Sequence, residues 1–189
     1  MKLYYAPGAC SLAPHIALRE AGRHFDLERV DLKTRRTSSG ANFLGINPRG
    51  DVPALQLDGP GSDVLVENAA VLQYIGDLAP EKLLVPPNGT FARYQLQSWL
   101  SFISGETIGQ HLLYLEEVLV GRAYLMGERF TVADAYLFVV LQWGDKLDMD
   151  LKTYPNLDDY EFRISQRPAV QQAMAAEGLR GRHHWKKSA

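Results

Sequence analysis

The sequence predicts an α/β domain followed by an all-helical domain. Up to about residue 80, short runs with the alternation of β-strands are interleaved with runs of helical periodicity. Residues 81–88 are rich in proline and lack periodicity, which is typical of a linker. After the linker, apolar residues recur only at helical spacing. We therefore predict one domain over residues 1–80 and a second over residues 89–189.

The first domain is predicted to have the element order β-α-β-α-β-β-α. Gly22 closes the first helix, because glycine tolerates the left-handed geometry of a helix end. Residues 58–61, Asp-Gly-Pro-Gly, are typical of a hairpin turn, so the strands on either side are predicted to be antiparallel. A polar segment, 34–40, follows the second strand. Strands are expected at 2–5, 26–32, 52–57 and 64–66, and helices at 12–20, at 41–46 and from Glu67 onward.

The second domain is predicted to be a helical bundle. Thr131 and Asp134 have the spacing of a capping box, in which the threonine hydroxyl bonds the Asp134 N–H and the carboxylate reaches back. The run 135–143 is almost wholly apolar, which predicts a helix buried on all sides at the centre of the bundle. Other helices are predicted at 91–104 and 112–120, and from Tyr154 and Arg167 onward.

Composition and charge exclude several classes of protein. With 46% hydrophobic and 22% charged residues, the chain has the composition of an ordinary globular protein. A net charge of -2 gives no electrostatic footprint for nucleic acid, and the longest apolar stretches are too short to span a bilayer. No signal-peptide pattern precedes the first strand. We expect no nucleic-acid or membrane partner, and we expect the basic segment 180–187 to be a solvated tail.

The single cysteine, Cys10, is the first candidate for chemistry. One cysteine can form neither an internal disulfide nor a cysteine-based metal site, which favours a reducing cytoplasm and no metal cofactor. Cys10 lies where the strand 2–5 breaks at Pro7-Gly8 and a helix begins near Ser11. Unpaired N–H groups at a helix start lower the pKa of a nearby thiol, so Cys10 is a candidate thiolate. The alternative is a structural role as a small buried hydrophobe.

Four segments carry a resemblance that covers nearly the whole chain. They are residues 2–15 (KLYYAPGACSLAPH), 47–55 (NPRGDVPAL), 67–75 (ENAAVLQYI) and 124–136 (YLMGERFTVADAY). In this order they resemble the cytosolic glutathione transferases, and in particular the bacterial beta class. The resemblance implies a thioredoxin-like, glutathione-binding domain followed by an all-helical domain, with glutathione as co-substrate and a homodimer as the assembly. It also implies that Cys10 lies beside the glutathione sulfur, with Ser11 as the second candidate donor.

The other predicted glutathione contacts combine residue chemistry with the resemblance. Val52-Pro53 lies at a strand start, where a cis proline would leave the Val52 backbone free to pair with an extended peptide such as glutathione. Glu67-Asn68 opens a helix, whose free N–H groups form an anion site for the γ-glutamyl carboxylate. By resemblance, Arg35 lies near the glycyl carboxylate, which an arginine fork can grip. His15 is expected to be a packed or solvated histidine rather than a catalytic one.

The chain also departs from the family pattern. A stretch between the segment 101–106 and the helix 112–120 is missing, which predicts a shortened helical hairpin that keeps its base. Ser101, Gly105 and Glu106 match positions that approach glutathione, either within one chain or across a dimer interface. Where the family has a histidine after the residue equivalent to Glu106, this sequence reads Thr107-Ile108.

Three functions stay open at this point. The resemblance favours a glutathione S-transferase that conjugates the glutathione thiolate to small hydrophobic electrophiles, with activity reduced if the lost hairpin tip walled the second-substrate site. A second hypothesis is a glutathione-dependent thiol-disulfide reductase that uses Cys10. A third is a non-catalytic protein that binds glutathione or a hydrophobic ligand.

Overall fold

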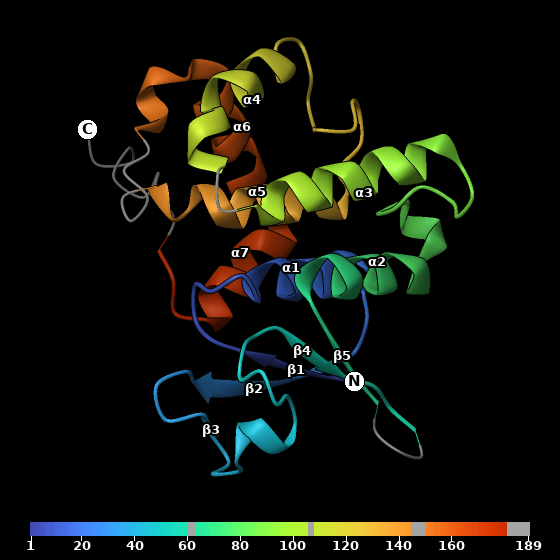
Figure 1. Ribbon diagram of the computed structural model, residues 1–189. Helices are drawn as coiled ribbons and strands as arrows, with labels where there is room; N and C mark the ends of the chain where they lie inside the picture. Colours follow the sequence, from blue (N-terminus) through green and yellow to red (C-terminus); the bar gives the residue numbers. More distant parts are fainter. Residues whose placement is uncertain (60–62, 106–107, 145–149, 181–189) are drawn as a thin grey trace.

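The computed structural model describes residues 1–59, 63–105, 108–144 and 150–180 (Figure 1). A mixed sheet forms one layer, α1, α2 and α7 form a middle layer against it, and the remaining helices lie beyond them (Figure 1). The predicted site residue Glu106 and almost all of the predicted basic tail lie outside the described residues. Within the described ranges, no helix combines the length and the apolar character needed to cross a membrane.

The N-terminal unit has the thioredoxin-like arrangement that was expected. Its five strands follow the order β3-β2-β1-β4-β5 across the sheet. β1 pairs in parallel with β2, whereas β1 with β4, β4 with β5 and β2 with β3 are antiparallel. The elements are β1 (Lys2–Tyr5), α1 (Leu12–Glu20), β2 (Asp26–Asp31), β3 (Arg36–Thr37), β4 (Ala54–Gln56), β5 (Val64–Val66) and α2 (Asn68–Leu78).

Three local predictions in this unit differ from the structure. The helix expected at 41–46 is a single 3-10 turn, Phe43–Gly45, in which the Asn42 side chain accepts a hydrogen bond from the Leu44 N–H. The polar segment 34–40 contains the strand β3, which is too short to show any alternation in sequence. The strand expected at 52–57 begins only at Ala54, because Pro53 has no N–H to give to a ladder.

The helical unit packs around α5, as the apolar run predicted. Every residue of α5 is buried. Its capping box is confirmed: the Asp134 carboxylate accepts hydrogen bonds from the Thr131 N–H at 2.7 Å and from the Thr131 hydroxyl at 2.9 Å. The helices of this part of the chain are α3 (Phe91–Ser104), α4 (Leu112–Val118), α5 (Val132–Leu141), α6 (Pro155–Ser165) and α7 (Pro168–Ala176).

One apolar core joins the two units. It runs from the helix-covered face of the sheet through α1 and α2 into α5 and α7, and a smaller cluster around Phe43 covers the other face of the sheet. The last helix, α7, returns to pack beside α1 of the N-terminal unit (Figure 1). The relative placement of the units is therefore fixed by burial of a shared apolar surface.

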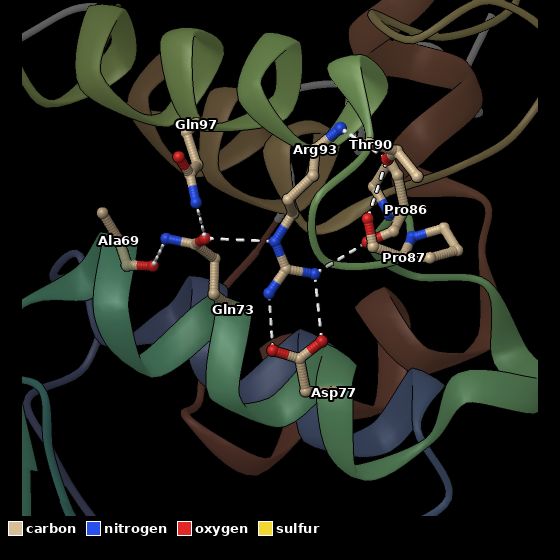
Figure 2. A network of polar contacts seen from close by, with 8 residues as sticks. All are labelled: Ala69, Gln73, Asp77, Pro86, Pro87, Thr90, Arg93 and Gln97. Carbon is tan, nitrogen blue, oxygen red and sulfur yellow. Dashed lines mark hydrogen bonds and ion pairs between the residues drawn. The ribbon is translucent and has the colours of Figure 1, made fainter.

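A polar network centred on Arg93 of α3 also joins the units (Figure 2). The Arg93 guanidinium, 4% exposed, donates two hydrogen bonds to the Asp77 carboxylate of α2 and one, of 2.8 Å, to the Pro86 carbonyl oxygen. The Gln73 side chain of α2 accepts from Arg93 at 3.3 Å and from Gln97 at 2.9 Å. This network ties α2, the linker and the first turns of α3 together (Figure 2).

Candidate functional site

A cleft of about 210 Å³ opens beside Cys10, at the end of the sheet where β1 gives way to α1. Its walls come from the loop before α1, the segment before β4, the end of β5, the start of α2 and one residue of α5. The lining residues are Cys10, Asn47, Arg49, Asp51, Val52, Pro53, Val66, Glu67, Asn68 and Tyr136. The cleft thus brings together five of the sequence-predicted residues: Cys10, Val52, Pro53, Glu67 and Asn68.

The Cys10 thiol is a hydrogen-bond donor in this cleft rather than a thiolate. Its Sγ donates to the Val52 carbonyl oxygen at 3.0 Å. Burial raises the pKa of the Cys10 thiol from 9.0 to about 11 and outweighs the backbone N–H groups of Cys10 and Ser11, which lower it. The prediction of a lowered thiol pKa is therefore wrong, because desolvation exceeds the effect of the helix start.

The Ser11 hydroxyl does not face the cleft. Ser11 is fully buried, and its Oγ accepts a hydrogen bond from the Ala6 N–H at 3.2 Å and donates to the Ala6 carbonyl oxygen at 3.3 Å. The expectation that this hydroxyl reaches a ligand sulfur is corrected, because both bonds keep it inside the turn before α1. What Ser11 offers to the sulfur at position 10 is its backbone N–H.

Val52 and Pro53 present a free backbone edge to the cleft. The Val52–Pro53 peptide bond is cis, as expected. Among the described residues, no group accepts a hydrogen bond from the Val52 N–H, whereas its carbonyl oxygen accepts from Cys10. An unpaired strand-like N–H beside an open cleft can receive the carbonyl of an extended peptide.

The start of α2 forms the opposite wall. Glu67, immediately before the helix, has a left-handed φ of 69°, a strained conformation for a residue with a side chain. Asn68, 6% exposed, donates from Nδ2 to the Cys10 carbonyl oxygen at 3.1 Å, while its buried Oδ1 finds no partner among the described residues. The first N–H groups of the helix have no intrahelical acceptor, which makes this end suited to a carboxylate.

The remaining predicted contacts do not line the cleft. Arg35 donates to the Gly50 carbonyl oxygen and lies 3.8 Å from the Asp51 carboxylate, so it reaches the cleft only through its neighbours. Ser101 is an exposed residue of α3, and Gly105 caps the end of that helix. Neither borders the cleft beside Cys10.

Five lining residues were missed by the sequence analysis: Asn47, Arg49, Asp51, Val66 and Tyr136. The Asn47 side chain donates to the Asp51 carbonyl oxygen at 2.7 Å and accepts from the Arg49 N–H at 3.2 Å, which shapes the turn before Val52. This turn looked like a helix stop alone, although asparagine commonly bonds its own local backbone. Tyr136 lies in a run of apolar residues, and its hydroxyl was the only feature of the sequence that could have indicated a place in the site.

The loop that carries Cys10 is held by residues of the C-terminal part. The Gly8 N–H donates to the Glu177 carboxylate at 3.0 Å, and the Gly8 carbonyl oxygen accepts from the Trp143 indole at 2.8 Å. The other Glu177 oxygen bonds the ring Nδ1 of His15 at 2.8 Å, with both side chains fully buried. His15 is therefore a packed, hydrogen-bonded residue of α1 outside the cleft.

In the part of the chain that the structure describes, no three His, Cys, Asp or Glu side chains are grouped to hold a metal ion. The chemistry of the cleft rests on a thiol, free backbone N–H groups and a helix start.

Comparison with known proteins identifies the family. The family model described as the glutathione S-transferase N-terminal domain matches residues 1–77, and the model of the C-terminal domain matches residues 102–168. The glutathione S-transferase GstA of Escherichia coli O157:H7 is 37% identical over 203 aligned residues, covering 95% of this chain and 100% of that protein.

Two solved structures extend the comparison. A sphingomonad glutathione S-transferase complexed with glutathione superposes with a TM-score of 0.89 at 43% identity, covering 95% of this chain and 100% of that one. The bacterial beta class enzyme of Sphingomonas chungbukensis superposes with a TM-score of 0.89 at 44% identity and the same coverage. With both domain models and full-length relatives in agreement, this chain belongs to the glutathione S-transferase family, in its bacterial beta class.

Proposed function

We propose that the cleft beside Cys10 binds glutathione and that the protein conjugates the glutathione thiolate to small hydrophobic electrophiles. One observation carries the proposal. The Val52 N–H and the first N–H groups of α2 lack hydrogen-bond acceptors, and they lie on opposite walls of the cleft that holds the Cys10 thiol. This is the pattern needed by an extended peptide with a carboxylate at one end and a sulfur in its middle. The relatives named above are glutathione S-transferases.

Each part of glutathione has a partner in this arrangement. The cysteinyl carbonyl pairs with the Val52 N–H beside Pro53, and the γ-glutamyl carboxylate lies at the first N–H groups of α2 after Glu67. The unpartnered Asn68 Oδ1 accepts from the γ-glutamyl ammonium group. At the other end, the glycyl carboxylate lies toward Arg35, which already contacts Asp51 of the cleft wall.

The reaction follows from holding the sulfur in place. Glutathione loses its thiol proton to solvent, and its thiolate lies against the Cys10 thiol and the Ser11 N–H. The sulfur lone pair then forms a bond to the electrophilic carbon while the leaving group departs with its bonding electrons. Because Cys10 keeps its own proton, its side chain is neutral and does not repel the thiolate.

The assembly and location are part of the same proposal. We place the protein in the cytoplasm, where its single thiol stays reduced. We further propose a homodimer in which Ser101 and Gly105 approach the glutathione of the partner subunit, since in the single chain neither residue borders the cleft.

A second candidate activity is favoured by the position of Cys10 in the cleft wall. In a thiol-disulfide reductase, the Cys10 thiolate would attack the glutathione sulfur of a mixed disulfide and release the other thiol. A glutathione thiolate would then attack the Cys10–glutathione disulfide, releasing oxidised glutathione and regenerating Cys10. The raised pKa of the Cys10 thiol slows the first step, so conjugation is the better supported function.

Three assays on the same preparation test these proposals. They are conjugation of a chloronitrobenzene, reduction of a glutathione mixed disulfide, and binding to immobilised glutathione. We expect binding and conjugation, with Cys10→Ser retaining binding. Binding without either turnover would leave a non-catalytic binding protein, and disulfide reduction that survives Cys10→Ala would exclude the reductase mechanism through Cys10. A chain that does not bind glutathione overturns the assignment of the cleft.

A further inference from the structure

A second cavity, of about 330 Å³, lies between the two units in a part of the molecule that the proposed reaction does not use. It is enclosed by the end of α1, residues 82–84 of the linker, residues 124 and 128–130 before α5, and Arg167 before α7. We call it the junction cavity. It shares no lining residue with the cleft beside Cys10. Its volume is that of an ordinary small-molecule site, and such sites often occur where two domains meet.

The Arg167 guanidinium is held in a fixed orientation at this cavity. Its Nε and Nη2 donate to the two carboxylate oxygens of Glu20, at 2.6 Å and 2.9 Å. Its Nη1 donates to the Tyr124 hydroxyl at 3.2 Å, and its central carbon lies 4.1 Å from the centroid of the Phe130 ring. The side chain is nevertheless 28% exposed, so part of the guanidinium faces the open cavity.

Arg167 and Tyr124 keep hydrogen-bond donors that the protein does not use. A guanidinium has five N–H groups, and three of those of Arg167 donate to Glu20 and Tyr124. The other two have no acceptor among the described residues. The Tyr124 hydroxyl accepts from Arg167, and its own hydrogen has no acceptor in the same part of the chain. Oriented donors of this kind suit a carboxylate, which has only acceptors.

Two further cations, Lys82 and Arg129, line the junction cavity. Both are exposed, and neither side chain has a hydrogen bond or an ion pair with another described residue. The carboxylates of the lining are Glu20, which is paired with Arg167, and the exposed Glu128. Positive charge therefore exceeds negative charge around the cavity, and the field there attracts an anion.

The linker adds an apolar wall beside these charges. Leu83 is 45% exposed and has a left-handed φ of 53°, a strained conformation for a leucine. Strain of this kind often occurs at ligand clamps. The cavity is also lined by Leu84 and the Phe130 ring, both of which are buried. A ligand that fits both parts of the lining has an anionic group and an apolar body.

We propose that the junction cavity binds a small organic carboxylate with an apolar body. The carboxylate accepts hydrogen bonds from Arg167, Lys82 and Arg129, and the apolar body lies against Leu83. The site is independent of the proposed reaction, because the ligand and glutathione occupy separate cavities. The ligand contacts residues of both units, so binding stabilises the folded chain.

Calorimetric titration of the full-length protein with benzoate, in the presence of saturating glutathione, tests the proposal. We expect benzoate to bind and to raise the unfolding temperature. Benzamide lacks the charge and acetate lacks the apolar body, so each should bind about tenfold more weakly than benzoate. The double variant Lys82→Gln with Arg129→Gln should weaken benzoate binding about tenfold, because each exposed cation contributes modestly. Glutathione binding should not change in this variant.

Arg122→Gln with Lys152→Gln is the matched control. It removes the same charge from two exposed positions that do not line the cavity, so it should bind benzoate like the wild type. The proposal is overturned if the wild type does not bind benzoate, if either analogue binds equally well, or if the two double variants behave alike. Displacement of benzoate by glutathione would place it in the cleft beside Cys10 and also overturn the proposal. A protein that binds benzoate as described but not glutathione overturns only the proposed function.

Discussion

The indole Nε1 of Trp143 donates a 2.8 Å hydrogen bond to the carbonyl oxygen of Gly8, 135 positions earlier in the chain. Gly8 is two residues before Cys10, and its N–H is held at 3.0 Å by Glu177. Both polar groups of one peptide residue are thus bonded by the C-terminal part of the chain. The position of the Cys10 thiol therefore depends on residues that sequence inspection would not connect with it.

Trp143→Phe should loosen the loop that carries Cys10. The variant keeps an aromatic ring but leaves the Gly8 carbonyl oxygen without its donor, which costs about 1 kcal/mol of unfolding free energy. Chemical unfolding measures this loss, and alkylation of Cys10 should become faster. Trp99→Phe is the control, since Trp99 contacts Phe102 and Tyr114 instead of the loop. Equal Cys10 alkylation rates in Trp143→Phe and the wild type would contradict the prediction.

Alkylation of Cys10 in the ligand-free protein should be slow at neutral pH and should rise steadily with pH. Burial holds the pKa of the thiol at about 11, so little thiolate is present near neutrality. Because the chain has one cysteine, the modified protein reports on this residue alone. A rate that levels off near pH 7 would show the lowered pKa that the helix start suggested.

The same raised pKa links Cys10 to stability. Because the pKa in the folded protein lies above the ordinary value of 9.0, the neutral thiol favours the folded state below pH 9.0. This contribution is lost as the pH rises toward about 11, where the unfolded chain ionises first. The free energy of unfolding of the wild type should therefore fall over this interval more steeply than that of Cys10→Ala. Parallel pH curves for the two proteins would argue against it.

Gly76→Ala should destabilise the packing of α2 against the linker. A Cβ at position 76 would overlap with Cγ1 of Val85, closer than real Cβ contacts come. Overpacking of this kind costs about 1–3 kcal/mol, which thermal unfolding can measure. Gly45→Ala is the control, because a Cβ there meets nothing within 4 Å. Adding Val85→Ala to Gly76→Ala should recover part of the loss, and failure to recover would place the strain elsewhere.

Arg93→Met should weaken the junction between the two units. It leaves the Asp77 carboxylate and the Pro86 carbonyl oxygen without their donor (Figure 2). We expect a loss of about 2 kcal/mol in unfolding free energy, moderated because Asp77 is 41% exposed and can bind water. A double-mutant cycle with Asp77→Asn measures the coupling of the pair. Additive effects in this cycle would show that the two side chains contribute independently.

The sequence predicted those elements whose pattern is long or chemically marked. The all-apolar run became the buried helix α5, and Thr131 with Asp134 formed the expected capping box. Short segments without a periodic pattern were mispredicted. The turn around Phe43 is stabilised by the Asn42 cap, and β3 is stabilised by pairing with β2. Neither interaction produces a periodic pattern in the sequence.

The sequence likewise predicted one part of the candidate site and missed another. Cys10, Val52 and Asn68 could be chosen from sequence because each stands at the end of an element, where backbone groups are unpaired. The pKa of the Cys10 thiol could not be predicted from the sequence, because burial of the thiol depends on neighbours that are distant in the chain. Tyr136 was missed for the same reason: it lines the cleft only because α5 packs against the N-terminal unit.

The bond between Gly8 and Glu177 joins residues 169 positions apart, so synthesis of the chain separates them widely in time. A ribosome that has released the whole N-terminal unit has yet to make the carboxylate that orders its Cys10 loop. The Cys10 thiol is among the first groups to be synthesised and among the last to be fixed in place. Ribosome-bound chains stalled before Glu177 and the released full-length chain should therefore differ in how quickly Cys10 is alkylated.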